Sequence, residues 1–307
     1  MRSRPDFVVI GASRSGTTSL HQYLGQHPDI YLGLRKSPNY FVAQDPQPAW
    51  ENPKLRAMAK QWISSQKDYE KFYRGVTHER AVGDVSPVYL QSIHSAKRIL
   101  ETLGPATKLV VILRNPVDRA YAHYLGRRRD GLETIDNFSA LVDRELAGPF
   151  NADIVFGCYT GCSRYHYFLT PYYQHFSADN IRVYLFEQLQ ADPFSVLRDL
   201  FCFLEVDPGY DVDTTFFHNQ TGIIRNPVLR SLWTRSVGLR TRLRPYLPAS
   251  IRHASRPILA QQVSRPILDV ETRLKIGAAL REDTLALQQL IDRDLSHWIV
   301  SNPHCDS

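Results

Sequence analysis

The sequence predicts an α/β fold in which a central, mainly parallel β-sheet is flanked by helices, in a P-loop-like three-layer sandwich. Apolar, β-rich runs of the kind that parallel sheets bury occur at 7–10, 108–113 and 181–186. Helical patterns lie between these runs and after the last of them. Strands that alternate with helices in this way are typical of an α/β domain.

Local signals place the individual elements along the chain. Strands are predicted at 7–10, 30–32, 81–85, 108–113 and 181–186. Helices are predicted at 17–26, 92–103, 116–129, 138–147, 164–176 and 193–204, with a longer helical region at 270–299. Pro28 ends the first helix, Gly104 ends the second, and Pro116 suits the first turn of the third. Residues 45–66 are predicted to form a loop and then a helix over the functional site.

Length and composition indicate a globular protein with one large domain. The chain has 307 residues, of which 43% are hydrophobic and 22% charged, and no convincing linker divides residues 1–307. No apolar run reaches the roughly 18 residues that a membrane span needs, and the N-terminus lacks the pattern of a signal peptide. The four cysteines form no CxxC pair, so neither a zinc site nor a disulfide scaffold is expected. We therefore expect a cytoplasmic protein in a reducing compartment.

The segment 7–20 combines a buried strand, a tight turn and a helix start. A helix start exposes unpaired backbone N–H groups and the positive end of the helix dipole, which together bind anions. The spacing from Gly11 to Gly16 fits a P-loop, but Thr17 stands where the lysine should follow, and Arg14 brings the positive charge. The sequence therefore predicts a phosphate or sulfate site unlike an ordinary ATP site, the alternative being a plain strand–turn–helix. The residues expected to form this site are Ser13, Arg14, Ser15, Gly16, Thr17 and Thr18.

Polar residues also follow the other predicted strands. Asp84 and Ser86 come at the end of one strand, Arg114 follows the next, and Glu187 follows the last. In an open parallel sheet, ligands bind at the carboxyl ends of the strands near a topological switch point. The combination of these polar segments is more specific than any one of them.

Together these segments resemble the sulfotransferases that use 3′-phosphoadenosine 5′-phosphosulfate (PAPS), and above all the heparan-sulfate type and its bacterial relatives. The matching segments fall in the family's order across roughly residues 6 to 300. They are 10–20, 27–30, 113–121, 163–165, 186–189, 219–222 and Arg225. The resemblance implies transfer of a sulfuryl group from PAPS to a hydroxyl of a carbohydrate, a glycolipid or another small metabolite, without a metal.

The resemblance also implies roles for individual residues in binding PAPS. The family's first loop binds the 5′-phosphosulfate, and Arg14 holds a cationic position at which many relatives carry lysine. A guanidinium there can offset charge as the sulfuryl group leaves. The second motif binds the 3′-phosphate through Arg114, whereas the serine expected eight residues later is replaced by Ala122. Four further residues match regions that close over the nucleotide in relatives: Tyr165, Thr221, Gly222 and Arg225.

The general base is the part of the predicted site that departs most from the family. In much of the family a glutamate follows a lysine in this segment, but here Ser37 follows Lys36. A serine is too weak a base, so Asp84 is predicted to take the proton of the acceptor hydroxyl. The alternative is that Asp84 only orients the Ser37 loop or caps a helix. His21 and His123 are further candidates, and Lys36 is expected to help hold the sulfate or the acceptor.

The net charge of +6 is concentrated in one region. Residues 214–268 contain nine arginines and no Asp or Glu, so the remainder of the chain is net negative. We predict a helical lid or insert at about 223–268, with three interpretations: a lid over the anionic nucleotide, a surface near anionic lipid, or a solvated face. Nucleic acid is not an expected partner, because no aromatic-interleaved binding motif accompanies the charge. The sequence indicates no oligomeric state.

Two alternative functions share the predicted anion site. The first is a P-loop kinase acting on a small hydroxyl compound, which the absent lysine after Gly16 and the lack of a clear Mg²⁺ carboxylate pair disfavour. The second is a nucleotide-binding protein with little turnover, which the departures at Ser37 and Ala122 suggest. The presence of both Arg14 and Arg114 favours the enzyme.

Overall fold

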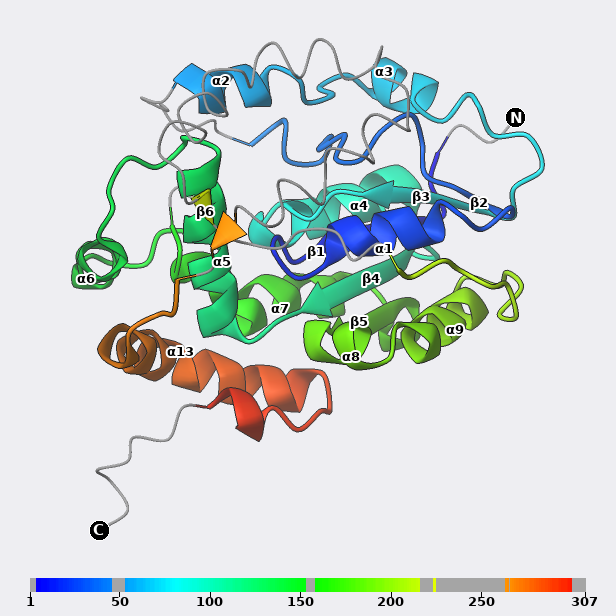
Figure 1. The fold of residues 1–307 in the computed structure, drawn as a ribbon. Helices are drawn as coiled ribbons and strands as arrows, with labels where there is room; N and C mark the ends of the chain where they lie inside the picture. The colour runs from blue at the N-terminus through cyan, green and yellow to red at the C-terminus, as the bar shows by residue number, and fades with distance from the viewer. Residues whose placement is uncertain are drawn as a thin grey trace.

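The computed structural model describes residues 4–45, 53–152, 158–215, 223–224, 263–264 and 266–299. Its centre is a five-stranded, wholly parallel sheet with the order β2-β3-β1-β4-β5 (Figure 1). The strands are β1 (Phe7–Gly11), β2 (Ile30–Tyr31), β3 (Ala81–Val85), β4 (Lys108–Leu113) and β5 (Ile181–Leu185). The order reverses between β1 and its two neighbours β3 and β4, so a topological switch point lies beside β1.

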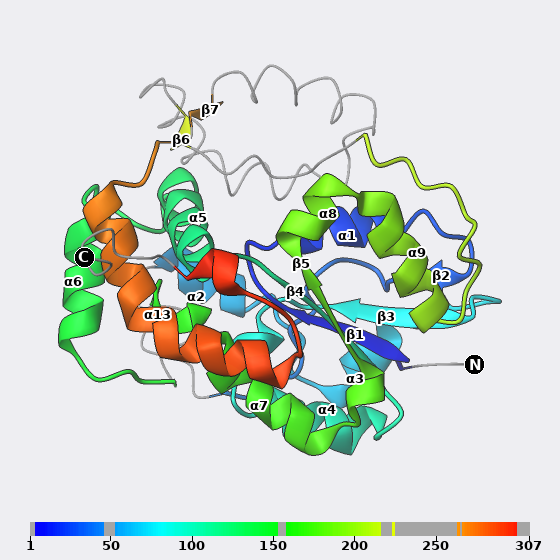
Figure 2. The same ribbon diagram turned by 90° about the horizontal axis from the view of Figure 1, so that it is seen from below.

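Successive residues of each central strand pack into different cores. Val8 and Ile10 of β1 belong to one hydrophobic cluster, while Phe7 and Val9 belong to another. This alternation follows from the two-residue period of a strand and explains the continuous apolar runs in the sequence, because both faces are buried. The helices on one face are α1 (Thr17–Leu24), α8 (Phe186–Ala191) and α9 (Pro193–Phe203). Those on the other are α3 (Gln66–Lys71), α4 (Ser95–Leu103) and α7 (Tyr165–His175), so the molecule has three layers (Figure 2).

A third cluster lies among helices beyond the carboxyl end of the sheet. It joins α5 (Pro116–Arg129), α6 (Phe138–Ala147) and α13 (Val270–Leu290). Asn115 caps α5, because its side-chain oxygen accepts hydrogen bonds from the N–H groups of Val117 and Asp118. The Arg273–Asp118 ion pair, with an N–O distance of 2.7 Å, links α13 to the first turn of α5. The start of α5, directly after β4, is therefore well fixed.

The predicted α/β class and the parallel sheet are confirmed, and each predicted strand and helix outside the arginine-rich segment is present. The bounds of α5 and α6 match the predicted ranges 116–129 and 138–147. The helix predicted within 45–66 is α2 (Pro53–Ala59), whereas two short helices, α3 and α8, were not predicted as separate elements. The remaining described strands, β6 (Ile223–Ile224) and β7 (Val263–Ser264), form a two-stranded antiparallel sheet.

The register of the sheet brings the ends of four strands to one edge. Val9 of β1 is paired with Val85 of β3, and Gly11 is paired with Val111 of β4. Leu113 of β4 is paired with Leu185 of β5. The segments that follow these strands therefore start side by side, as parallel pairing requires.

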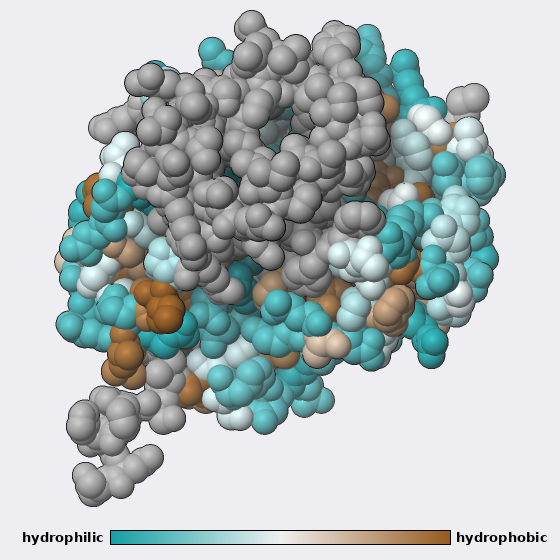
Figure 3. Space-filling view, in the orientation of Figure 1, coloured by the Kyte–Doolittle hydropathy of each residue, from teal (hydrophilic) through white to brown (hydrophobic). Residues whose placement is uncertain are grey.

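The described surface gives no sign of a membrane-spanning element. Within the described ranges, no helix is long and apolar enough to cross a bilayer. On the face shown in Figure 3 the described residues are mostly hydrophilic, and the hydrophobic patches are small and separate.

The arginine-rich segment predicted at about 223–268 lies almost entirely outside the described residues, so its three interpretations stay predictions.

Candidate active site

The loop between β1 and α1 leads into the start of α1 without a side-chain cap. Gly16 is the N-cap of this helix with a φ of 88°, and no side chain caps the helix start. A residue with a side chain is strained at this φ, and a Cβ on Gly16 would also lie 2.9 Å from the Phe186 ring. The first turn of α1 contains no acidic residue. Its backbone N–H groups and the helix dipole therefore favour an anion.

Lys36 extends from the segment after β2 to the start of α1. Its Nζ lies 2.9 Å from Thr18 Oγ1 and 3.3 Å from Thr17 Oγ1, and donates to both hydroxyls. Burial, and secondarily the charge of Arg14, lowers the pKa of the Lys36 ammonium to about 8. A lysine distant in sequence thus takes a place beside the helix start, where the P-loop lysine is missing.

The Lys36 segment is attached to the end of β3. The Ser37 N–H donates to the carbonyl of Val85 at 3.0 Å, and the Asn39 N–H donates to Ser86 Oγ at 3.2 Å. Ser37 and Asn39 have φ values of 62° and 57°, a left-handed conformation that asparagine tolerates better than most residues. These bonds fix the backbone on both sides of Pro38 and so direct Lys36 toward α1.

Arg14 places a second cation close to Lys36, but its side chain lies along α5. The Arg14 guanidinium contacts the backbone of Gly126, where a Cβ would lie 2.1 Å from Nη2. Burial lowers the pKa of Arg14 to about 10, the charge of Asp130 opposes this shift, and neighbouring arginines of α5 add to it. Arg14 and Lys36 thus lie in a strongly positive region, which suits a multiply charged anion.

Arg114, directly after β4, lies on the other side of the loop. Its side chain is 5% exposed, and Nη1 donates to the Arg14 carbonyl at 3.2 Å. The guanidinium carbon lies 4.9 Å from the centre of the Phe186 ring, a cation–π distance. The Tyr165 hydroxyl donates to the Arg114 carbonyl at 3.0 Å, and burial raises the pKa of this phenol to about 12. Phe186 and Tyr165 therefore hold Arg114 from two sides.

Asp84 lies in the core below the Lys36 segment. The carboxyl group is buried, with an exposed fraction of 1%. Oδ2 accepts from the Tyr69 and Tyr89 hydroxyls at 2.8 Å each, and Oδ1 accepts from Ser86 Oγ at 2.7 Å. Burial raises the pKa of Asp84 to about 6 although the three hydroxyls lower it. Both oxygens of the residue predicted as the base are therefore engaged with neighbouring side chains.

The two histidines considered as bases have lowered pKa values. Burial, followed by the charge of Lys36, lowers the pKa of His21 to about 4. Burial, followed by the charge of Arg119, lowers the pKa of His123 well below its usual range. Both imidazoles are therefore neutral near pH 7.

The structure brings most of the predicted site residues to one edge of the sheet. Residues 13–18, Lys36, Arg114 and Tyr165 connect through the contacts above, whereas the Asp84 side chain is linked to the Lys36 segment through Ser86 and the backbone of Asn39. Three predicted residues lie outside the described ranges: Thr221, Gly222 and Arg225. The sequence predicted no contact between Gly126 and Arg14, and it gave Phe186 no role of its own in the site. The motif that includes Phe186 was recognised, but nothing in the sequence pointed to its position beneath Arg114.

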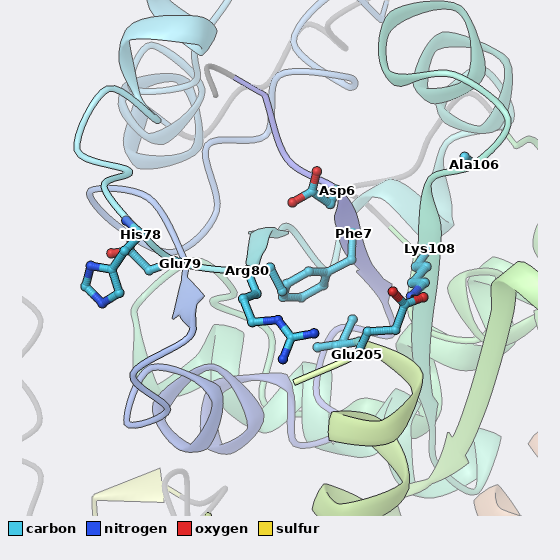
Figure 4. A pocket seen from close by; sticks show the side chains of 10 residues that line it. Asp6, Phe7, His78, Glu79, Arg80, Ala106, Lys108 and Glu205 are labelled. Atoms are coloured by element: carbon cyan, nitrogen blue, oxygen red, sulfur yellow. Dashed lines mark hydrogen bonds and ion pairs between the residues drawn. The ribbon is translucent and has the colours of Figure 1, made fainter. Parts of the chain in front are cut away.

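A polar pocket lies at the opposite edge of the sheet (Figure 4). Its volume is about 560 Å³. Phe7, Ala81 and Lys108, the first residues of β1, β3 and β4, line it, and the ion pair between Lys108 and Glu205 spans 2.6 Å at its wall. The pocket is therefore separate from the carboxyl edge that carries the candidate active site.

In the described part of the chain, no group of three or more His, Cys, Asp or Glu residues could hold a metal ion.

Comparison with known proteins identifies the family. A family model described as "Sulfotransferase family" matches residues 5–211, more than half of the chain. The chain belongs to the sulfotransferase family. This confirms the resemblance seen in the sequence, and the match includes the loop at 13–18, Lys36, Arg114 and Tyr165.

Sulfotransferases from several organisms are similar to the chain. It is 30% identical over 166 residues to the membrane-associated sulfotransferase kil1 of Dictyostelium discoideum, covering 52% of this chain and 31% of that protein. It is 28% identical over 149 residues to human heparan sulfate glucosamine 3-O-sulfotransferase 6, covering 48% and 37%. The chain spans about a third of the length of these curated relatives. A sulfotransferase structure from Alicyclobacillus acidocaldarius matches with a TM-score of 0.73 and 28% identity, covering 96% of this chain and 98% of that one.

Proposed function

We propose that this chain transfers a sulfuryl group from PAPS to a hydroxyl group of an acceptor. The observation that carries the proposal is the Lys36 ammonium on the Thr17 and Thr18 hydroxyls at the uncapped start of α1. Arg14 lies close enough to lower the pKa of Lys36. Two cations beside N–H groups that no side chain caps match the charge of a phosphosulfate, which supplies the sulfuryl group when PAPS is bound.

Each part of the loop has a specific role in this proposal. The N–H groups of Gly16, Thr17 and Thr18 at the start of α1 hold the 5′-phosphosulfate, and the Ser13, Ser15, Thr17 and Thr18 hydroxyls belong to the same loop and helix start. Lys36 and Arg14 offset the charge that grows on the bridging oxygen as the sulfuryl group leaves. The Lys36 ammonium has the lower pKa of the two and is the better placed, since it already donates to the helix start.

The 3′-phosphate is assigned to Arg114 and its neighbours. The guanidinium stacks on Phe186, and Tyr165 fixes the backbone of the same arginine, so this side chain is preorganised for a phosphate. Ala122, which replaces the expected serine, is 2% exposed. Thr221, Gly222 and Arg225 remain predicted contacts to the nucleotide.

The contacts of Asp84 favour the second of the two roles considered for it, orientation of the Ser37 loop. Three hydroxyls occupy its carboxylate, so it has no oxygen directed at an acceptor. Ser86 donates to Asp84 and accepts from the Asn39 N–H, which connects the carboxylate to the segment that carries Lys36. We infer that Asp84 is a positioning residue for Lys36 and not the group that takes the proton.

The acceptor class is proposed from the family and the charge of the chain. Relatives with names such as heparan sulfate glucosamine 3-O-sulfotransferase favour a carbohydrate, and a glycolipid or another small metabolite is the alternative. A glycolipid acceptor would suit contact between the arginine-rich segment and an anionic membrane. A cytoplasmic location, independence from metal and the absence of a nucleic-acid partner remain parts of the proposal.

The experiment is to incubate the purified chain with PAPS and a panel of disaccharides, glycolipids and phenols, with and without EDTA. We expect release of 3′-phosphoadenosine 5′-phosphate (PAP) that depends on one acceptor class and is insensitive to EDTA. Binding of PAP without release for any acceptor would favour a nucleotide-binding protein. Consumption of ATP that requires Mg²⁺, without PAP binding, would replace this proposal with a kinase.

A further inference from the structure

Gly126 lies within the last turn of α5, inside the helix, where glycine is less favourable than alanine. Glycine destabilises a helix interior relative to alanine, because it loses more backbone freedom on folding. Gly126 does not have a positive φ, unlike Gly16 and Gly131, so the backbone conformation does not require glycine here. The reason for this glycine must therefore be sought in its surroundings.

The Arg14 guanidinium fills the space that a side chain at position 126 would need. An added Cβ would lie 2.1 Å from Nη2, 2.3 Å from Cζ and 2.7 Å from Nη1 of Arg14. Real Cβ atoms do not approach other atoms this closely, so the guanidinium would have to move. Because these atoms form the far end of a flexible side chain, such a movement strains the fold little and displaces mainly the charge.

We propose that Gly126 is a positioning residue, which lets Arg14 place its guanidinium against α5 beside Lys36. The pairing is one of size: an arginine at position 14 requires glycine at 126, whereas a lysine at 14 tolerates a side chain there. Lysine ends in a single nitrogen, where arginine ends in a planar fork of three atoms. The inference deepens the proposed function and rests on it for the effect on PAP.

The test is a double-mutant cycle of Gly126→Ala and Arg14→Lys, read by calorimetric binding of PAP and by thermal unfolding. Gly126→Ala should lower PAP affinity about tenfold while the unfolding midpoint stays constant or rises, since alanine favours the helix. Arg14→Lys should weaken PAP binding in the wild-type background but not in the Gly126→Ala background. Purely additive effects, or normal PAP binding by Gly126→Ala, would refute the pairing.

A second readout does not depend on the nucleotide. Phenylglyoxal modifies accessible guanidinium groups, and mass spectrometry of peptides follows the modification of Arg14. We expect slow modification in the wild type and faster modification in Gly126→Ala, with Arg182, on β5, as the internal reference. Failure of wild-type PAP binding would refute the proposed function alone, whereas an unchanged rate at Arg14 would refute the role of Gly126 alone.

A separate observation concerns Cys158 and Cys162, which face each other in the segment before α7. Their Sγ atoms lie 3.0 Å apart, without a disulfide between them. Cys158 is half-buried and Cys162 is buried. The Glu145 carboxylate accepts hydrogen bonds from the N–H groups of Tyr159, Thr160 and Gly161. These bonds hold the turn between the two cysteines.

We infer that this pair is a site of reversible oxidation by a peroxide. The more exposed Cys158 thiolate attacks one peroxide oxygen and the O–O bond breaks. Cys158 becomes a sulfenic acid, and the other peroxide oxygen departs as water after it takes up a proton. The Cys162 sulfur then attacks the Cys158 sulfur, the S–O bond breaks, and a second water leaves. Two thiols are oxidised to a disulfide and one hydrogen peroxide is reduced to two waters. The hydrogen bond from Cys162 lowers the pKa of Cys158, in agreement with its role as the attacking thiol.

The test treats the folded chain with hydrogen peroxide, removes the peroxide, unfolds the chain in urea that contains iodoacetamide to block the remaining thiols, and maps the peptides by mass spectrometry. We expect a disulfide between Cys158 and Cys162 that dithiothreitol reverses, while exposed Cys202 remains alkylated. Cys158→Ser should leave Cys162 alkylated under the same conditions. Alkylation of both cysteines in the wild type at peroxide levels that oxidise Cys202 would overturn the inference.

Discussion

The Lys36 ammonium lies 2.9 Å from the Thr18 hydroxyl oxygen, so a lysine from the segment after β2 reaches the first turn of α1. In an ordinary P-loop the lysine comes from the helix start itself. Here Thr17 holds that place, and its hydroxyl also accepts a hydrogen bond from Lys36. The positive charge of the cradle therefore depends on how the Lys36 segment is attached to β3.

Replacing Lys36 by methionine should weaken the binding of PAP by about 10- to 100-fold. This range corresponds to the loss of about 1.5–3 kcal/mol that hydrogen bonds to a charged group contribute. Calorimetry measures the affinity, and Lys97→Met is the matched control, because Lys97 is an exposed lysine of α4 that pairs with Glu101. Equal affinities for the two variants would show that Lys36 does not contact the anion.

The binding of PAP should decline as the pH rises above about 8. The pKa of Lys36 in the free protein is lowered to about 8, so the ammonium loses its proton above this pH and the anion loses a partner. Affinity should then fall by up to about tenfold per pH unit. Titrations between pH 7 and 10 measure the slope. Lys36→Arg should move the decline to higher pH, and a wild-type slope that Lys36→Met retains would contradict this account.

Asp84→Asn and Ser86→Ala should act on the same step if Asp84 positions the Lys36 segment. Both variants disturb the connection from Asp84 through Ser86 to the Asn39 N–H, so both should weaken PAP binding. The expected loss is about 1–3 kcal/mol for a buried group left without its partner. If Asp84 were the general base, the pattern would differ. The Asp84→Asn variant would bind PAP normally but lose turnover, and the Ser86→Ala variant would keep its turnover.

Arg114→Ala should remove the preference for nucleotides that carry a 3′-phosphate. The wild type is expected to bind PAP much more tightly than AMP, since Arg114 is held by Phe186 and Tyr165 for that phosphate. In the variant the two affinities should converge, mainly through weaker binding of PAP. Arg182→Ala is the control, because this arginine lies at the opposite end of β5 and stacks on Phe203. An undiminished preference in Arg114→Ala would place the 3′-phosphate elsewhere.

The fold could be predicted from the sequence where local patterns and tertiary packing agree. The apolar run of β4 is buried on both faces of the sheet, and Pro116 begins α5 where its missing N–H is not needed. The start of α8 at Phe186 was predicted as the end of a strand. Phe186 is apolar like the strand before it, and the helix start is marked instead by Gln188, whose side-chain oxygen accepts a hydrogen bond from the Leu185 N–H.

The candidate site could be predicted only in part, for a physical reason. The Gly11–Gly16 spacing and the arginine after β4 are local signals, so the cradle and Arg114 were found. The contact between Arg14 and Gly126 depends on how α5 packs against the loop. The hydroxyls of Tyr69 and Tyr89 on Asp84 likewise come from separate elements. No short sequence pattern contains such contacts, and for that reason Asp84 was predicted as the general base.

The most direct test of the central claim is calorimetric titration of the wild type and of Lys36→Met with PAP, AMP and ATP, in the absence of Mg²⁺. The account predicts that the wild type binds PAP most tightly, that AMP and ATP bind much more weakly, and that Lys36→Met loses most of the affinity for PAP. Wild-type protein that binds ATP as tightly as PAP, or Lys36→Met that binds PAP like the wild type, would contradict it.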